Sequence, residues 1–245
     1  FQSTFDWRDH RAKLTKSLGV VMTMGCLHQG HAALMRRAVA ENDATVLTIF
    51  VNPTQFNQQS DLDNYPETLE ADLALADSLG VDFVILPTYQ QLYPDQYRYR
   101  VAESELSLLM EGQYRPGHFD GMLTVVLKLL LLVQADRAYF GEKDYQQYQL
   151  IEGMARAFFI DTKIVPCPTV REASGLAMSS RNTRLTKAQR KLADRFNVIL
   201  REAETCKACA DQLAALGFTV DYVKTHNSRR FAAVSLGQVR LIDNI

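Results

Sequence analysis

The chain has 245 residues, of which 47% are apolar and 22% charged, and its formal net charge is −1. This composition is typical of soluble globular proteins, and the length permits one large domain or two smaller ones. The near-neutral charge gives no general basic field for nucleic acid. The apolar run from Met122 to Val133 carries Lys128 and is shorter than the ~20 residues that cross a bilayer, so no membrane partner is expected either.

The cysteines and the first residues bear on the cellular setting. The stretch from Phe1 to Lys13 lacks the apolar core of a signal peptide. Four cysteines occur, and a chain of this size does not need disulfides, so a reducing, cytoplasmic setting is expected. Cys206 and Cys209 form a lone CxxC with no second pair and no nearby histidine, which favours an incidental helix surface over metal or redox chemistry.

Alternating strands and helices are predicted over the first part of the chain. The stretches 19–24, 44–51 and 81–87 are short apolar runs, as buried parallel strands usually are. Between them, 31–42 has apolar residues at helical spacing, and 66–80 has Pro at its start, acids in its first turn and Gly at its end. This alternation predicts an α/β fold with a parallel sheet and right-handed crossovers.

The middle of the chain is less regular. A loop-rich stretch at 110–121 precedes an expected helix at 122–133 and an expected strand at 136–141. A further helix at about 144–159 and a strand at 162–170 follow. These elements extend the same sheet.

The character of the sequence changes after residue 170. A polar loop covers 171–185, and a helix is expected from Thr186. Three short apolar stretches, 218–223, 230–237 and 239–245, then read as strands around a helix. The polar loop therefore separates the parallel-sheet domain from a small α+β domain.

The stretch from Met22 to Met35, "MTMGCLHQGHAALM", places His28 and His31 where the first strand hands over to a helix. Ligands of open parallel sheets bind beyond the carboxyl ends of the strands, and the N–H groups and dipole of a helix N-terminus attract phosphate. Gly25 and Gly30 let the backbone approach a ligand, and both imidazole rings can donate to one anion. The pattern is neither GxGxxG nor GxxxxGK[ST]. Two alternatives remain: both histidines are capping or core residues, or they are zinc ligands that lack a convincing third partner.

The segment "TMGCLHQGH" resembles the HxGH signature of the nucleotidyltransferase superfamily, here His28-Gln29-Gly30-His31. Further stretches make the chain similar to the pantoate–β-alanine ligase family, also called pantothenate synthetases, over nearly its whole length. They are "FVNPTQF" (50–56), "DLDNYPET" (61–68), "YRPGHFDG" (114–121), "DRAYFGEKDYQQ" (136–147), "REASGLAMSSRN" (171–182) and "VRLIDNI" (239–245).

This resemblance implies an ATP- and Mg²⁺-dependent enzyme that joins pantoate to β-alanine through pantoyl adenylate, with release of pyrophosphate and AMP. It also implies a homodimer, a Rossmann-like nucleotide- and pantoate-binding domain over 1–175, and a small α+β domain over 176–245 that acts as a cover. Two alternatives are weighed: a nucleotidyltransferase of the same superfamily that makes a nucleotide conjugate, and a nucleotide-binding sensor without turnover.

The resemblance also assigns site residues. His31, His28 and Lys143 are expected to be catalytic, and Asp144 to reach Mg²⁺ or the ribose. Val170 is expected to touch adenine through its backbone. The expected ATP site comprises Met24, Gly25, Cys26, Leu27, His28, Gln29, Gly30, His31, Gly141, Glu142, Lys143, Asp144, Val170, Met178, Ser179, Ser180 and Arg181.

The acid and amine substrates have their own expected residues. Gln55 and Gln147 match the two pantoate glutamines of the family, and Gln55 is also expected at β-alanine. Arg115 and His118 are expected to steer carboxylates. The loop that carries Met178 to Arg181 contains Gly175 as a hinge and is expected to close over the adenylate, which water would otherwise hydrolyse.

Two places depart from the family's pattern. Around 204–206 and again at 223–231 the chain looks shorter than expected. The strand signal at 218–223 runs into the next one with hardly a turn. The sequence therefore predicts a missing loop at each place, both in the small domain.

Overall fold

The computed structural model describes residues 1–57 and 59–245, which form two compact units. The first unit consists of Phe1–Gly141 and Gln146–Cys167, and the second of Glu142–Tyr145 and Pro168–Ile245. The domain boundary expected at 175/176 and the role of 176–245 as a cover stay predictions. Within the described residues, no helix combines the length and the apolarity that crossing a membrane requires.

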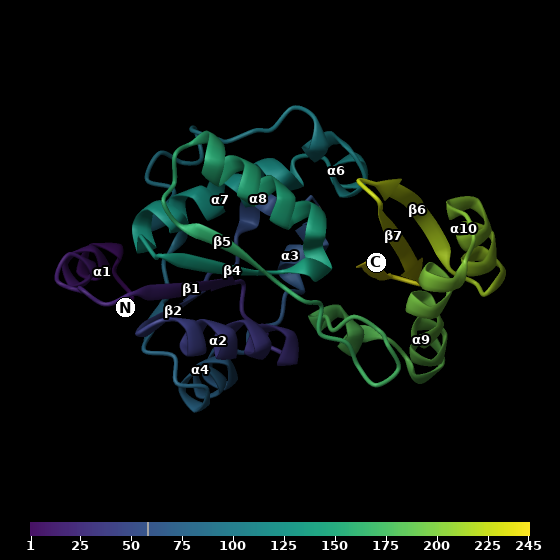
Figure 1. The fold of residues 1–245 in the computed structure, drawn as a ribbon, viewed down its shortest axis with the longest axis horizontal. Helices are drawn as coiled ribbons and strands as arrows, with labels where there is room; N and C mark the ends of the chain where they lie inside the picture. The colour runs from purple at the N-terminus through teal and green to yellow at the C-terminus, as the bar shows by residue number, and fades with distance from the viewer. Residues whose placement is uncertain (58) are drawn as a thin grey trace. The chain divides into compact units, whose positions relative to one another are not determined.

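The first unit is built on a five-stranded sheet in the order β3-β2-β1-β4-β5, with every neighbouring pair parallel (Figure 1). Its strands are β1 (Leu18–Thr23), β2 (Ala44–Ile49), β3 (Phe83–Ile85), β4 (Arg137–Gly141) and β5 (Lys163–Cys167). Nearly every residue of β1 and β2 is buried, as expected of central strands covered on both faces. The predicted α/β fold is confirmed, and the chain reverses its direction of winding between β1 and β4, where ligands of such sheets bind.

Helices cover both faces of this sheet. Figure 1 shows α2 and α4 on one face and α7 and α8 on the other. The helical elements of the first part of the chain are α1 (Thr4–Arg11), α2 (Gln29–Glu41), η1 (Pro53–Gln55), α3 (Gln59–Asp63), α4 (Leu69–Ser78), α5 (Tyr89–Leu92), η2 (Leu106–Leu108), α6 (Glu111–Tyr114), α7 (His118–Val133) and α8 (Tyr145–Ala157).

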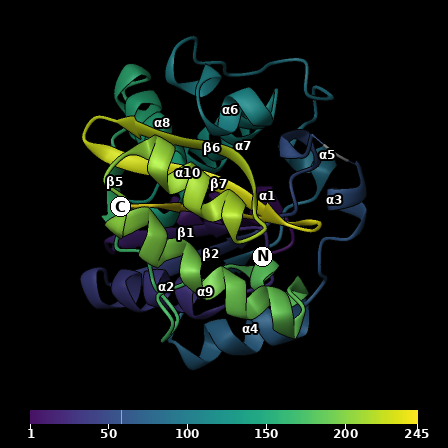
Figure 2. The same cartoon turned by 90° about the vertical axis from the view of Figure 1, so that its right-hand side faces the viewer.

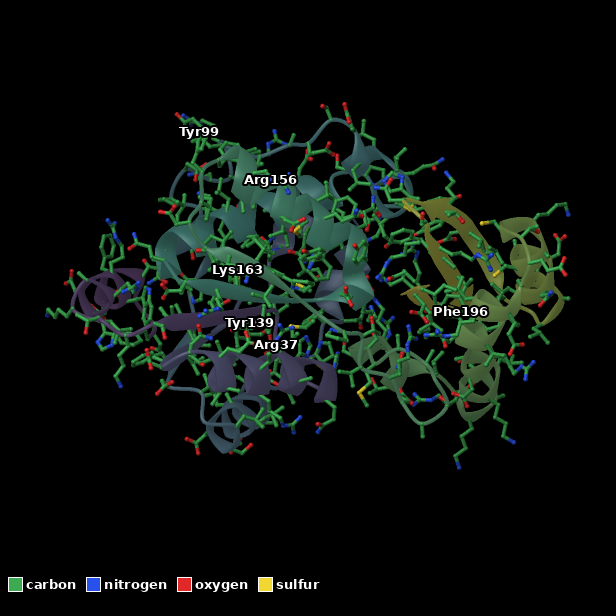
Figure 3. All side chains as sticks on the ribbon, viewed as in Figure 1. Arg37, Tyr99, Tyr139, Arg156, Lys163 and Phe196 are labelled. Carbon is green, nitrogen blue, oxygen red and sulfur yellow. The ribbon has the colours of Figure 1, made fainter. Side chains whose placement is uncertain are left out.

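A polar contact joins the sheet to the C-terminal end of α2. The hydroxyl of Tyr139, on β4, donates to Glu41 at 2.9 Å and accepts from the Asn42 amide at 2.8 Å. Burial is the main cause that raises the pKa of Tyr139 to about 12. Arg37 of α2 lies over the same ring at 5.9 Å, and both residues are labelled in Figure 3. These contacts fix the helix that begins at the histidines.

The helix predicted at 122–133 begins earlier, at His118, and a short helix lies within the stretch read as loop. The glycines that favoured a loop have other uses. Gly117 has φ of 77° directly before the helix, a left-handed conformation that glycine adopts without strain. At Gly121 a Cβ atom would lie 2.3 Å from the carbonyl oxygen of Thr54. Gly121 therefore lets α7 pack closely against the backbone of Thr54.

The second unit is a small α+β unit, as predicted. Figure 2 shows α10 in front of the β6–β7 hairpin. Its elements are η3 (Glu142–Asp144), η4 (Ser180–Arg184), α9 (Lys187–Glu202), α10 (Cys206–Ala215) and the antiparallel strands β6 (Thr219–His226), β7 (Arg229–Leu236) and β8 (Val239–Asn244). Fully buried Phe196 of α9, labelled in Figure 3, contributes to its apolar core. Cys206 and Cys209 are free thiols on α10.

No missing loop is needed at the two places where the sequence predicts one. Asn227 and Ser228 both have positive φ, 46° and 64°, and they join β6 to β7 as a tight hairpin. Only residues 203–205 connect α9 to α10. The last of them, Thr205, caps α10 by accepting the N–H of Ala208 at 3.1 Å. Both connections are short but regular, which a pattern of apolar residues does not reveal.

Candidate active site

The two histidines of the HxGH stretch cap the start of α2. Nδ1 of His28 accepts the N–H of Gly30 at 3.0 Å, and Nδ1 of His31 accepts the N–H of His28 at 3.2 Å. The ring centroids lie 4.1 Å apart at an interplanar angle of 33°. Because each Nδ1 accepts a backbone proton, a neutral ring carries its own proton on Nε2. The two histidines therefore cap α2, as one of the alternatives predicts, and each neutral ring also carries an N–H donor at Nε2.

The backbone before these histidines adopts a left-handed turn. Gly25 has φ of 84° and Cys26 has φ of 51°. The N–H groups of Cys26 and Leu27 donate to the two carboxylate oxygens of Asp72, at 2.9 and 2.8 Å. Asp72 lies on α4, is only 3% exposed, and also accepts the hydroxyl of Thr68 at 3.0 Å. These two amides, expected near ATP, therefore already bind a carboxylate of the chain.

Asp72 is a residue that the sequence analysis missed. It stands among several acids in the first turn of an expected helix, where carboxylates are common for dipole reasons alone. Nothing local distinguishes it from exposed Glu70, two residues before it. The only hint is the sequence position of the helix, which is the last element before β3.

The thiol of Cys26 is kept in its protonated form. Burial is the larger cause that raises its pKa, and the negative charge of Asp72 adds to the rise. A hydrogen bond with Thr68 acts in the opposite direction. A thiol with a raised pKa is a poor nucleophile, so this residue fills space in the turn.

Beyond the end of β2, Gln55 meets several polar groups of the first unit. Its side-chain amide donates to the sulfur of Met24 at 3.3 Å, and its Oε1 accepts from Asn52 at 3.0 Å. Nδ1 of His118 lies 2.8 Å from the carbonyl oxygen of Gln55, and Nε2 of the same ring lies 3.0 Å from Arg115. The structure thus brings together the expected pantoate residue and the two expected carboxylate-steering residues.

Asn52, which the sequence analysis missed, organises this region. It is 1% exposed, and its Oδ1 accepts from the hydroxyls of Tyr93 at 2.9 Å and Thr54 at 3.0 Å. Its amide also donates to the carbonyl of Gly121 at 3.2 Å. Burial is the main cause that raises the pKa of Tyr93 to about 12. The segment that carries Gln55 is therefore rigidly held.

Two adjacent glutamines on α8 differ in their surroundings. Gln146 is buried, donates to the carbonyls of Leu106 and Leu109 at 2.8 Å each, and accepts the N–H of Glu111 at 3.1 Å. Gln147, the expected second pantoate residue, is half-buried. The structure gives Gln146 a supporting role, and Gln147 stays the candidate ligand.

The turn that carries Lys143 belongs to the second unit. The side-chain amide of Asn244, the last residue of β8, donates to the carbonyls of Glu142 and Lys143, both at 2.9 Å. Arg229 approaches the Glu142 carboxylate at 3.9 Å, and its guanidinium lies 3.8 Å from the ring centroid of Tyr145. Lys143 Nζ lies 3.6 Å from a carboxylate oxygen of Asp144.

The loop after β5 brings most of the remaining expected residues together. The N–H of Met178 donates to the carbonyl of Val170 at 3.0 Å, and Ser179 Oγ accepts the N–H of Arg181 at 3.3 Å. At Gly175 φ is 90°. The loop is anchored by Arg171, which forms two hydrogen bonds with Asp243, at 2.7 and 2.9 Å, and by Asn182.

The expected site residues are thus distributed over the two units. The first unit holds Met24, Gly25, Cys26, Leu27, His28, Gln29, Gly30, His31, Gln55, Gly141 and Gln147. The second unit holds Glu142, Lys143, Asp144, Val170, Met178, Ser179, Ser180 and Arg181. Among the residues that the structure describes, no three His, Cys, Asp or Glu side chains gather as a metal site would require.

Comparisons with known proteins identify the family of this chain. The family model of pantoate-beta-alanine ligase matches residues 2–245. The pantothenate synthetase of Legionella pneumophila strain Philadelphia 1 is 52% identical over 246 residues, which cover 100% of this chain and 98% of the relative. That of Coxiella burnetii strain RSA 493 is 52% identical over 241 residues, which cover 98% and 93%.

Solved structures lead to the same family. The pantoate-beta-alanine ligase of Francisella tularensis, crystallised with beta-gamma ATP and beta-alanine, superposes with a TM-score of 0.95 at 41% identity and covers 100% of this chain and 96% of its own. The pantothenate synthetase of Thermus thermophilus gives a TM-score of 0.93 at 39% identity, with 100% and 98% covered. The chain therefore belongs to the pantoate–β-alanine ligase family of enzymes.

Proposed function

We propose that the chain joins pantoate to β-alanine with ATP in two steps. A carboxylate oxygen of pantoate attacks the α-phosphorus of ATP, and pyrophosphate leaves as the P–O bond to it breaks. The amine nitrogen of β-alanine then attacks the carbonyl carbon of pantoyl adenylate, loses a proton, and expels AMP. The observation that carries the proposal is the pair of histidine rings at the N-terminus of α2, both fixed through Nδ1.

His28 and His31 act as hydrogen-bond donors to the phosphates. Phosphoryl transfer depends on positioning and on neutralising charge more than on covalent help. In the neutral tautomer that the caps favour, each Nε2–H is a donor held by a backbone bond on the far side of its ring. A preorganised donor of this kind contributes about 3–4 kcal/mol to lowering the barrier.

Lys143 and Asp144 supply the charges of the second unit. Lys143 is a compact point charge suited to phosphate, and its Asn244-bound backbone restricts where it can reach. Asp144 would be the residue that holds Mg²⁺, because carboxylate oxygens are ligands that this ion prefers and the side chain is 45% exposed. The bound ion would neutralise phosphate charge.

Gln55 and Gln147 recognise pantoate, and Gln55 also faces β-alanine. An acid with two hydroxyls is best oriented by groups that both donate and accept, as amides do. Arg115 supplies positive charge beside His118, 3.0 Å from its Nε2, and favours the approach of carboxylate substrates. An ion pair with Glu111 at 4.0 Å keeps this guanidinium in place.

The loop through Met178, Ser179, Ser180 and Arg181, with the domain 176–245, covers the adenylate and excludes water. Gly175, with φ of 90°, is its hinge. The protein acts as a homodimer in the cytoplasm. If the loop is a cover, ATP lowers amide hydrogen exchange across 171–185; equal exchange with and without ATP contradicts this part of the proposal.

One assay of AMP and pyrophosphate release tests the reaction. AMP release that requires ATP, pantoate and β-alanine together supports the ligase. Pyrophosphate release without AMP supports the alternative nucleotidyltransferase, which the family and its relatives do not favour. Absence of both products supports a nucleotide-binding sensor and overturns the proposal.

Two variants separate the capping role of His31 from its role at phosphate. His31→Gln keeps an acceptor for the His28 N–H, because glutamine at this position also completes a capping box. His31→Ala removes both functions. Adenylate formation is expected to be lost in His31→Ala and strongly reduced in His31→Gln, while only His31→Ala loses stability. His226→Ala, in the β6–β7 hairpin, is the control and keeps full activity.

A further inference from the structure

We infer that Asp72 is a positioning residue for this reaction: its buried carboxylate holds the left-handed turn before His28 and thereby fixes the direction of both histidine rings. The inference rests on the proposed function for its effect on rate. Its structural part stands on the bonds from Cys26 and Leu27, at 2.9 and 2.8 Å.

The turn presents two successive N–H groups to one anion. Gly25 and Cys26 have positive φ, 84° and 51°, and the N–H groups of Cys26 and Leu27 both point to the carboxylate of Asp72. In many proteins such N–H groups bind a phosphate or another external anion. Here they bind the carboxylate of Asp72, with one oxygen for each amide. The chain therefore fills its own anion site and uses it as an anchor.

The anchor is needed because the turn is strained. A left-handed conformation at a residue with a side chain is unfavourable, and Cys26 adopts it. The two hydrogen bonds to the Asp72 carboxylate offset the cost of this conformation, because hydrogen bonds to a charged acceptor are stronger than neutral ones. The hydroxyl of Thr68 completes the shell of the carboxylate at 3.0 Å, and the residue is 3% exposed. The strained conformation is thus maintained by a rigid, buried group.

Gly25 is explained by the same contact. A Cβ atom at this position would lie 3.0 Å from Asp72 Oδ2 and 3.3 Å from a methyl group of Ile49. A side chain here would require the carboxylate or the Ile49 methyl group to shift by a few tenths of an ångström. The glycine therefore serves the approach of Asp72 as well as the positive φ of 84°.

The direction of the rings follows from this turn. Leu27, whose N–H is bound to Asp72, directly precedes His28, the N-cap of α2. The N–H of His28 is in turn the donor to Nδ1 of His31. Rotation of the backbone at Leu27 would therefore move one ring and remove the cap of the other. Asp72 acts on both rings through the backbone, without a role at the substrate itself.

Asp72→Asn tests the inference with little change in shape. The amide has one oxygen acceptor, and its nitrogen cannot accept the second backbone N–H. We expect kcat for adenylate formation to fall about 10–10²-fold, the effect of a misplacement near 1 Å, while KM for pantoate stays within twofold. Asp77→Asn, an exposed carboxylate on the same helix, is the matched control and keeps the wild-type rate. Thr68→Val leaves both amide bonds in place and is expected to lose less than Asp72→Asn.

Nitrogen NMR of the histidine side chains gives a readout that does not depend on activity. In the wild type both rings are expected as the Nε2–H tautomer, because each Nδ1 accepts a backbone proton. In folded Asp72→Asn protein the rings are expected to show a mixture of tautomers. Wild-type ring signals in Asp72→Asn would overturn the inference, as would an unchanged kcat. If the wild type has no ligase activity, the proposed function is wrong. The NMR comparison then still tests whether Asp72 fixes the histidine rings.

Discussion

The turn after β1 and the turn after β4 are held by opposite kinds of hydrogen bond. In the histidine turn, backbone N–H groups of Cys26 and Leu27 donate to a carboxylate. In the lysine turn, backbone carbonyls of Glu142 and Lys143 accept from the side-chain amide of Asn244. In the first turn two N–H donors converge, so the turn needs an acceptor. In the second turn two carbonyl oxygens converge, so the turn needs a donor.

The two anchors also differ in their distance along the chain. Asp72 is 45 and 46 residues from the amides that it binds, within the same parallel-sheet unit. Asn244 is 101 and 102 residues from its carbonyls and belongs to the antiparallel sheet of the second unit. The histidine turn thus depends on the helix between β2 and β3, whereas the lysine turn depends on the last strand. Four predictions test this difference.

The largest expected effect is that of removing the charge from the lysine turn. Lys143→Ala is expected to lower kcat/KM for ATP by ~10²–10³-fold, as loss of a donor aimed at developing charge does. Pantoate binding should change little. Steady-state kinetics with each substrate varied in turn measure both effects, and Lys163→Ala, exposed on β5 (Figure 3), is the control. A larger effect on pantoate than on ATP would contradict the assignment.

Asn244→Asp should disturb the lysine turn without removing the lysine. A carboxylate cannot donate to the carbonyls of Glu142 and Lys143, so the turn loses both bonds. We expect about a tenfold fall in kcat/KM for ATP, equivalent to one lost hydrogen bond in the transition state. Asn227→Asp, in the exposed β6–β7 hairpin, should leave the kinetics unchanged. A normal rate in Asn244→Asp would show that the clamp is dispensable.

The thiol of Cys26 reports on the histidine turn. Burial and, second, the charge of Asp72 raise its pKa, so little thiolate is present near pH 8. Replacing Asp72 by Asn removes the charge, lowers the pKa and should speed alkylation by iodoacetamide, measured on the Cys26 peptide by mass spectrometry. Asn244→Asp should leave this rate unchanged, because it affects the other turn. Equal alkylation in the wild type and Asp72→Asn would contradict the described contact.

The smallest effect is expected at the N-terminus of α9. Thr186 caps this helix by accepting the N–H of Gln189, whose side chain accepts the N–H of Thr186. Thr186→Ala is expected to lower the free energy of unfolding by about 1 kcal/mol. For a chain of this size the Tm should fall by about 2–4 °C. The rate at 25 °C should stay normal; a loss of activity would mean that α9 contributes to the reaction.

The sequence predicts the helices and strands better than the residues that hold them and their turns in place. The strand and helix order follows from apolar runs and helix punctuation, and the HxGH stretch lies where it was expected, at the start of α2. The start of α7 at His118 was not predicted, because Gly117 and Gly121 suggested a loop. Gly121 is there for its contact with Thr54, which is 67 residues away in the sequence and invisible to a local pattern.

Asp72 and Asn244 were not predicted for the same physical reason. Each is an ordinary residue type at an ordinary place, an acid in the first turn of a helix and an amide at the end of a strand. What distinguishes them is the backbone that each one meets after folding. The motif residues can be predicted from sequence because their chemistry requires unusual spacing, whereas a supporting residue needs only to be at hydrogen-bond distance from its partner.

The clamp of Asn244 on the lysine turn has a consequence for biosynthesis. At ~5–20 residues per second, the 101 residues between Lys143 and Asn244 take about 5–20 s to translate. During that interval a nascent chain already contains Asp72 and can form the histidine turn, but the carbonyls of Glu142 and Lys143 still lack the Asn244 amide. On the proposed function, the wild-type rate of ATP turnover is therefore reached only after residue 244 has emerged from the ribosome, because the lysine turn lacks both Asn244 bonds until then.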